Sequence, residues 1–181
     1  MLLDVNYKFL GNINVTEKVL QLTEEVKKIS WADDDFSRNE KALLAGKIIE
    51  YPYKISSQKH AEYSHLTGEL SEEIVSHIQK IIPDGIFVRG EIAALLPGVN
   101  ILPHIDNKDF HKISHRIHVP LITNEDCMNV FESEEIHFPA YSIFEINNRV
   151  LHHAYNNGLE PRIHLIFDVT TRELYDNRDS I

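Results

Sequence analysis

The sequence predicts a mainly β protein with flanking helices, whose strands form an antiparallel sandwich or barrel. Short segments rich in β-forming residues follow one another after Gly85. Turn sequences such as Pro97-Gly98 and Asn156-Asn157-Gly158 separate them. Because no helical pattern lies between these segments, antiparallel pairing is favoured. The expected strands are residues 86–96, 100–105, 116–122, 129–131, 141–146, 150–155 and 162–169.

Two amphipathic helices are expected before the strands. Between Asn14 and Ile29, apolar residues recur every three or four positions, and Asn14 with Glu17 has the pattern of a capping box. A second helix is expected from about Leu70 to Ile82, where isoleucines form one stripe that should pack on a sheet. The Pro83-Asp84-Gly85 sequence ends it.

Length and composition indicate one globular domain. The chain has 181 residues, of which 43% are hydrophobic and 25% charged, and no apolar run is long enough to span a membrane. We expect a single domain over residues 1–181, with a flank of helices and strands over residues 1–85 and a core that carries the site over residues 86–170.

Charge and cysteine content exclude some function classes. The formal net charge of −10 opposes binding to nucleic acid phosphates. The single cysteine, Cys127, forms no internal disulfide and no thiolate zinc cluster. The first ten residues lack the pattern of a secretory signal, so a cytoplasmic protein is expected.

Histidines concentrate in the β-rich half, where eight of the eleven lie between positions 104 and 164. His104 and Asp106 stand two apart at the end of an expected strand, so both can face one ion, although such a triplet often arises by chance. A facial triad needs a second histidine from another strand. His152 and His153 both fit, and since successive side chains on a strand face opposite ways, one of them should reach the metal.

Two further segments carry arginine and histidine on one face. Alternation places Arg116 with His118, and Arg162 with His164, opposite apolar neighbours. If these faces point into the interior, they require bound anions, metal or water, because unpaired buried polar groups are costly. A guanidinium such as that of Arg162 can bind the distal carboxylate of a dicarboxylate. The alternative, that both faces point outward, stays open.

The order of these motifs resembles the aspartyl/asparaginyl β-hydroxylase family, and proline 3-hydroxylases are similar over the same stretch. The resemblance covers roughly residues 86–170 and rests on the motifs in their order. The motifs are Arg89-Gly90-Glu91, His104-Ile105-Asp106, Arg116-Ile117-His118-Val119-Pro120-Leu121, Phe144-Glu145-Ile146-Asn147-Asn148, His152 with Asn156, and Arg162-Ile163-His164-Leu165-Ile166-Phe167-Asp168.

The resemblance implies a cupin-like jelly roll, the double-stranded β-helix, and a set of site residues. It implies that iron(II) is bound by His104, Asp106 and His152, the last favoured over His153 because its distances to Asn156 and Arg162 match the family's spacing. The cosubstrate 2-oxoglutarate would chelate the metal. Three residues are implied to bind it: Arg162 at the distal carboxylate, with Arg116 and His118 lining the pocket.

The implied activity is that of an iron(II)- and 2-oxoglutarate-dependent dioxygenase. It would use O2 to hydroxylate an amino acid side chain at the β-carbon, free or in a peptide or protein, and ascorbate could stimulate it. The alternative is a metal-binding cupin of another class, an isomerase or binding module that does not use 2-oxoglutarate. The Trp31–Phe36 segment could cap the pocket or form a solvated acidic loop.

Overall fold

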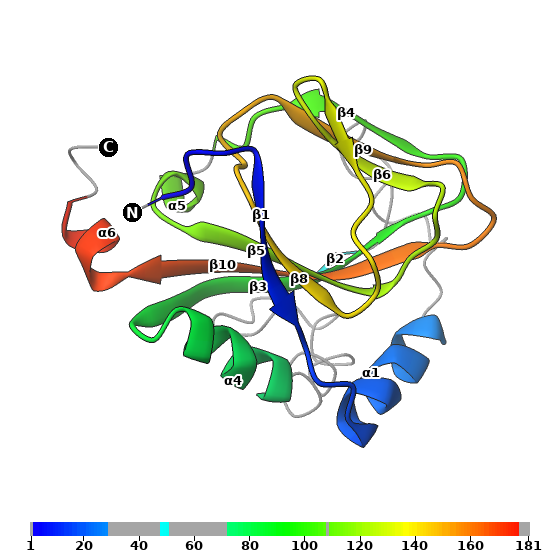
Figure 1. The fold of residues 1–181 in the computed structure, drawn as a ribbon, viewed down its shortest axis with the longest axis horizontal. Helices are drawn as coiled ribbons and strands as arrows, with labels where there is room; N and C mark the ends of the chain where they lie inside the picture. Colours follow the sequence, from blue (N-terminus) through cyan, green and yellow to red (C-terminus); the bar gives the residue numbers. More distant parts are fainter. Residues whose placement is uncertain (1, 29–47, 51–71, 108, 178–181) are drawn as a thin grey trace.

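The protein folds into two antiparallel sheets with helices on the outside of the larger one (Figure 1). The computed structural model describes residues 2–28, 48–50, 72–107 and 109–177. The acidic segment Trp31–Phe36 lies outside the described residues, as does the expected start of the second helix at Leu70.

The larger sheet has six strands, in the order β1-β8-β5-β10-β3-β2, and the smaller has four, in the order β4-β9-β6-β7. Strands β3, β5, β8 and β10 lie in the large sheet and β4, β6, β7 and β9 in the small one, so the chain repeatedly crosses between the sheets. This topology is the double-stranded β-helix, or jelly roll, that was predicted. The strands are β1 (Tyr7–Asn12), β2 (Ile48–Glu50), β3 (Gly85–Leu95), β4 (Asn100–His104), β5 (His115–Ile122), β6 (Cys127–Phe131), β7 (Glu134–Ile136), β8 (Ser142–Ile146), β9 (His152–Asn156) and β10 (Arg162–Thr171).

The predicted strands are confirmed, most with ends shifted by one or two residues, and the described structure adds three. Strands β1, β2 and β7 were not expected from the sequence. Each ends up at the edge of its sheet or is only three residues long, so its pattern of buried side chains is weak. Strand β1 pairs with β8, more than 130 residues away in sequence, as in the partners Tyr7 and Ile146. Local sequence patterns do not report such a distant pairing.

Both expected helices form, with corrected ends. Helix α1 is Glu17–Lys27, and its N-cap is Thr16, whose side chain accepts a hydrogen bond from the backbone N–H of Val19. The prediction that Asn14 caps it was therefore wrong. Helix α4 is Glu72–Ile81. The structure adds two short helices, α5 (Asp109–Lys112) and α6 (Arg172–Asp176), and none of the described helices is long and apolar enough to span a membrane.

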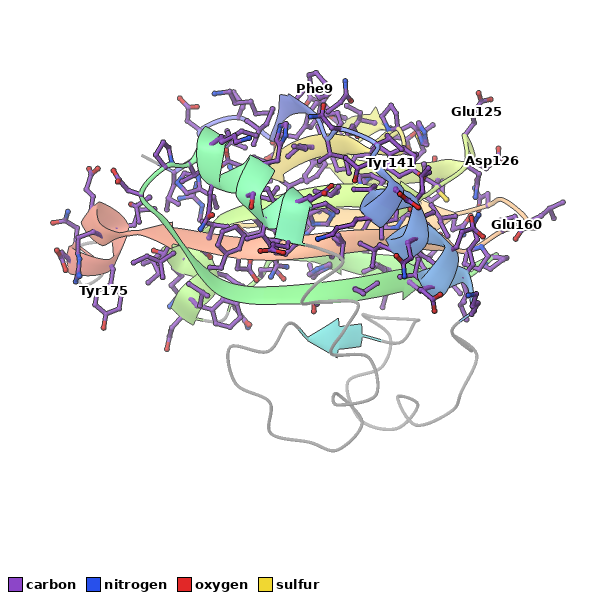
Figure 2. The ribbon with its side chains drawn as sticks, turned by 90° about the horizontal axis from the view of Figure 1, so that it is seen from below. Phe9, Glu125, Asp126, Tyr141, Glu160 and Tyr175 are labelled. Carbon is purple, nitrogen blue, oxygen red and sulfur yellow. The ribbon has the colours of Figure 1, made fainter. Side chains whose placement is uncertain are left out.

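The main apolar core lies between the two long helices and the large sheet. Figure 2, which views the molecule from below, shows α1 and α4 in front of that sheet. From the helices, Leu22 and Ile78 enter this core, and from the sheet Ile117 and Leu165 meet them. A second, smaller cluster of buried side chains surrounds Phe138 and is separate from this core. Because Ile117 and Leu165 alternate with Arg116, His118, His164 and Arg162, the opposite face of the large sheet carries the polar groups.

Truncating Leu22 should destabilise the protein strongly, and the neighbouring Leu20 provides a matched control. Leu22 is 0% exposed and Leu20 is 49% exposed on the same helix. The substitution Leu22→Ala leaves a cavity and should lower the free energy of unfolding by about 2–5 kcal/mol. Leu20→Ala should change it by less than about 1 kcal/mol. Urea unfolding of both variants measures the difference; equal losses would show that α1 does not pack as described.

Candidate metal centre

His104, Asp106 and His152 come together at one end of the small sheet. Strands β4 and β9 pair antiparallel, with His104 directly opposite His152. The two imidazole rings have centroids 4.4 Å apart. Asp106 lies in the loop just after β4, and one candidate ligand atom from each of the three residues lies within 4.8 Å of the others. The expected triad therefore converges in space.

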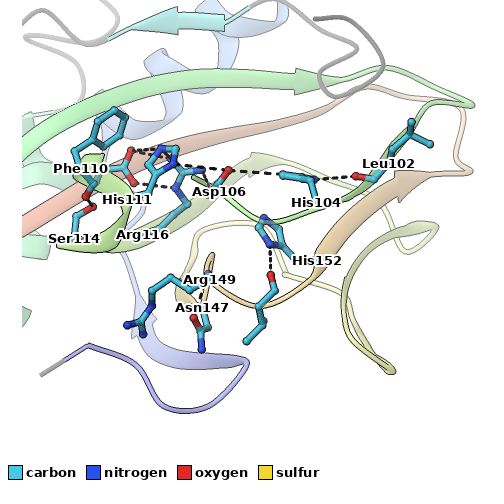
Figure 3. Close-up of polar contacts among 12 residues, drawn as sticks. Leu102, His104, Asp106, Phe110, His111, Ser114, Arg116, Asn147, Arg149 and His152 are labelled. Carbon is cyan, nitrogen blue, oxygen red and sulfur yellow. Dashed lines mark hydrogen bonds and ion pairs between the residues drawn. The ribbon is translucent and has the colours of Figure 1, made fainter. Parts of the chain in front are cut away.

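Both histidines of the triad are held with Nε2 as the candidate ligand atom. The Nδ1–H of His104 donates to the carbonyl oxygen of Leu102 at 2.8 Å, and that of His152 donates to the carbonyl oxygen of Val150 at 2.9 Å (Figure 3). A backbone acceptor on Nδ1 fixes the tautomer and leaves the lone pair on Nε2. Burial lowers the pKa of His152, which favours the neutral imidazole that a metal binds.

Asp106 completes the donor set with a charged carboxylate. Burial by itself would raise the pKa of Asp106, but the pKa is lowered overall, chiefly by the positive charge of Arg116. Two neutral imidazoles and one carboxylate are the donors of the facial triad that binds non-haem iron(II), so the residues fit such an ion.

His153 points away from this cluster. It lies on the face of β9 opposite to His152, and its partner across the ladder is Val130 of β6. His153 is not part of the cluster of possible ligands within the described part of the chain. The geometry therefore brings His152, rather than His153, next to His104 and Asp106.

Arg162 is a buried cation whose charge has no partner in the described part of the chain. It is 4% exposed, and its Nη1 donates to the amide oxygen of Asn129 at 3.1 Å. No described carboxylate forms an ion pair with it, and its buried Nε has no hydrogen-bond partner among the described residues. Burial lowers the pKa of Arg162 to about 10, so it still carries its charge at neutral pH. A charged guanidinium that is buried without a carboxylate partner is stabilised by binding an anion.

Two buried histidines, His118 and His164, share the inner face with Arg162. Their Nδ1 atoms lie 3.3 Å apart, and within the described residues neither Nε2 has a partner. Burial lowers the pKa of both rings well below the usual histidine value; the guanidinium group of Arg162 lowers it further in both, and that of Arg116 does so for His118. Since both rings are neutral and share one Nδ1 proton, one Nε2 carries a hydrogen and the other a lone pair. The alternative that these faces point outward was wrong.

Arg116 is held in a network of polar side chains. Its Nε and Nη2 donate to the two carboxylate oxygens of Asp168 at 2.8 and 2.9 Å, and its Nη1 donates to Asp106 Oδ2 at 2.5 Å. Its Nη2 also contacts His111 Nε2 at 2.6 Å (Figure 3). Together these four contacts involve every guanidinium hydrogen except one on Nη1. The guanidinium is thus adjacent to the triad.

Sequence reasoning did not single out Asn129, His111 or Asp168. Asp168 was detectable, because alternation along β10 places it on the same face as Arg162 and His164. His111 was not, since it lies on the short helix α5, which has no sequence pattern of its own. Asn129 contacts Arg162 only because β6 of the small sheet lies over β10 of the large one.

Residues 48–172 match the sequence model of a family described as aspartyl/asparaginyl β-hydroxylase. The match includes every residue of the candidate site and more than half of the chain. The chain belongs to the aspartyl/asparaginyl β-hydroxylase family. The expected resemblance is thereby confirmed, and the family indicates a hydroxylase or related oxygenase. The chain matches no curated protein sequence at a significant level.

Several solved structures share the fold. A viral collagen prolyl hydroxylase from Paramecium Bursaria Chlorella virus-1, a 2OG complex, is 13% identical with a TM-score of 0.60, over 93% of this chain and 97% of that chain. The α-ketoglutarate-dependent epimerase SnoN from nogalamycin biosynthesis is 14% identical with a TM-score of 0.61, over 92% of this chain and 78% of its own. A Pseudomonas putida prolyl-4-hydroxylase is 12% identical with a TM-score of 0.55, over 93% and 94%. At these low sequence identities the similarity shows only that the fold is shared.

Replacing His152 should remove metal binding, whereas replacing His153 should spare it. The geometry places His152 Nε2 beside Asp106 and places His153 on the opposite face. For His152→Ala we expect Co²⁺ binding to weaken by more than the roughly 10- to 100-fold caused by loss of an outer-shell partner. Titration followed by visible absorption measures this. The reverse pattern between the two variants would reassign the third ligand.

The protein should lose stability as the pH falls through the usual histidine range. The folded protein keeps His118 and His164 neutral because their pKa is lowered, whereas the unfolded chain protonates them near pH 6.5. The unfolded state therefore binds more protons below that pH, and each histidine removes up to about 1.4 kcal/mol of stability per pH unit. Urea unfolding with chelator present, between about pH 7.5 and 5.5, measures the slope. It should be shallower in His164→Gln; an unchanged slope would contradict the assignment.

Proposed function

We propose that the protein is an iron(II)- and 2-oxoglutarate-dependent hydroxylase that acts on an amino acid side chain, free or in a peptide, at the β-carbon. The observation that carries the proposal is Arg162, a buried guanidinium with no carboxylate partner among the described residues, in a jelly roll that also brings together His104, Asp106 and His152. A dicarboxylate cosubstrate supplies the missing anion.

In this proposal each group of residues has a separate task. His104 Nε2, one Asp106 oxygen and His152 Nε2 hold the iron, which together with 2-oxoglutarate supplies the oxidising chemistry when bound. Arg162 binds the distal carboxylate of the cosubstrate through charge-assisted hydrogen bonds, with Asn129 fixing the guanidinium from behind at 3.1 Å. His118 offers its unpartnered Nε2 on the same inner face as Arg162, and Arg116, which contacts the metal ligand Asp106, lines this face as well.

Burial of the polar inner face supports a reaction that is shielded from solvent. Arg116, His118, Arg162 and His164 are all buried between the sheets, so water is largely excluded from the cosubstrate. The whole chain serves as one domain in this proposal, because β1 and β2 from the first half extend the sheet that carries Arg116 and Arg162.

Several observations support the proposal over a cupin that does not use 2-oxoglutarate. Such a cupin has no need for an unpaired buried arginine, which is costly to retain. The family is one of hydroxylases. Two proteins of similar fold are described with the same cosubstrate, SnoN as α-ketoglutarate dependent and the viral collagen prolyl hydroxylase as a 2OG complex.

The decisive experiment measures succinate. Purified protein with iron(II), ascorbate and 2-oxoglutarate should form succinate slowly alone and faster with a suitable amino acid or peptide, whose mass should rise by one oxygen atom. Mass spectrometry follows both products. If correctly metallated protein neither binds nor converts 2-oxoglutarate, the proposed function is wrong.

Replacing Arg162 should weaken cosubstrate binding without removing the metal. A lost charge-assisted hydrogen bond is worth about 1.5–3 kcal/mol, so Arg162→Leu should raise the dissociation constant for 2-oxoglutarate by about 10- to 100-fold. Arg172→Leu, at an exposed arginine of α6, is the matched control. Calorimetry on metal-loaded protein gives both constants, and an unchanged constant for Arg162→Leu would remove this residue from the site.

A further inference from the structure

Asp168 stands out as a buried carboxylate for which neither the triad nor the cosubstrate provides a role. It is 1% exposed on β10, and its partner across the ladder on β5 is Arg116. Both of its oxygens accept hydrogen bonds from Arg116, at 2.8 and 2.9 Å. Such a two-point contact fixes the plane of the guanidinium and not only its distance. Arg116 is thus rigidly oriented by a residue on the neighbouring strand.

The oriented guanidinium reaches the metal carboxylate. Its Nη1 donates to Asp106 Oδ2 at 2.5 Å, while Asp106 Oδ1 faces His104 Nε2 at 3.8 Å (Figure 3). One oxygen is therefore committed to Arg116 and the other is directed at the site where a metal would lie. This arrangement favours coordination through a single carboxylate oxygen.

Asp106 needs such support because no strand holds it. His104 and His152 belong to paired strands, whereas Asp106 lies in the loop after β4. Its backbone N–H donates to the carbonyl oxygen of Asn148 at 3.0 Å, which anchors the main chain. Within the described residues, Arg116 and His104 are the partners that its side chain meets closest, together with His111 Nδ1 at 3.9 Å.

We propose that Asp168 is a positioning residue for the metal: through Arg116 it holds the Asp106 carboxylate in the orientation that binds iron through one oxygen. The inference rests on the proposed function, because it presupposes that Asp106 binds a metal. Asp168 acts two side chains away from that ion. The charges agree with this role, since Arg116 shared between Asp106 and Asp168 leaves one negative charge to meet a divalent cation.

Co²⁺ titration of the metal-free protein tests the proposal without relying on turnover. Asp168→Asn keeps the shape of the side chain but removes its charge and one of its two acceptor oxygens. Loss of an outer-shell partner weakens metal binding by about 10- to 100-fold, and we expect a loss in this range. The visible absorption bands of bound Co²⁺ should also shift, because Asp106 becomes free to rotate.

Glu145→Gln is the matched control. Glu145 is a second buried carboxylate, and it pairs with His115 at 2.6 Å on the other side of β5 and β8. Its loss should lower the melting temperature while leaving the Co²⁺ dissociation constant and spectrum unchanged. A merely structural role for Asp168 would give this same result, with a lower melting temperature and unaltered Co²⁺ binding, and would overturn the proposal.

A double-variant comparison tests whether Asp168 acts through Arg116. Arg116→Lys keeps the charge but loses the two-point contact, so it should also weaken Co²⁺ binding. Adding Asp168→Asn to Arg116→Lys should then change the constant by no more than about twofold. Full multiplication of the two separate effects would overturn the proposal. If Asp168→Asn does not fold, Arg116→Lys alone tests the proposal. A Co²⁺ affinity of Arg116→Lys equal to that of the wild type would overturn the proposal.

The outcomes separate this inference from the proposed function. If the wild-type protein does not bind Co²⁺, the proposed function fails, and the inference with it. If the wild-type protein binds Co²⁺ and Asp168→Asn and Arg116→Lys both bind it as tightly as the wild type, the inference fails while the proposed function stands.

Discussion

The antiparallel pairing of β4 with β9 is the contact on which the candidate site depends. It places His104 opposite His152, so that the two rings lie 4.4 Å apart although the residues are distant in sequence. The backbone carbonyls of Leu102 and Val150 then hold the rings with Nε2 directed at one point. The ladder thus fixes two donors rigidly, and the third, Asp106, is fixed by side chains instead.

The inner face of the large sheet carries buried polar groups that need partners. Arg116, His118, Arg162 and His164 are buried there, where each unpaired polar group costs free energy. Asp168 and Asp106 neutralise Arg116, whereas Arg162 has no such partner among the described residues. The opposite face of the same sheet is apolar and packs on α1 and α4. The larger apolar core therefore lies on one face of this sheet, and the buried polar groups lie on the other.

Much of the fold could be predicted because its strands alternate clearly. Strand β10 shows Ile163, Leu165 and Phe167 on one face, and this pattern predicted both the strand and its polar face. Strand β1 escaped prediction because it is an edge strand, with exposed positions such as Phe9 that local patterns do not explain. The cap of α1 was misplaced by two residues because Asn14 and Thr16 are both good capping residues, and only the packed helix selects Thr16.

The sequence by itself determined the residue types of the site: a His-x-Asp pair, two candidate histidines, and two arginines in segments where polar and apolar residues alternate. Their order was specific enough to indicate the family. The tertiary structure decided which of them meet, because pairing across strands depends on register, and a shift of one residue would turn His153 instead of His152 toward the metal. It alone showed that Arg116 is bound by Asp168 and Asp106, while Arg162 is buried without a carboxylate in the described chain. Charge balance in an interior is a property of three-dimensional neighbours, and no single stretch of sequence contains it.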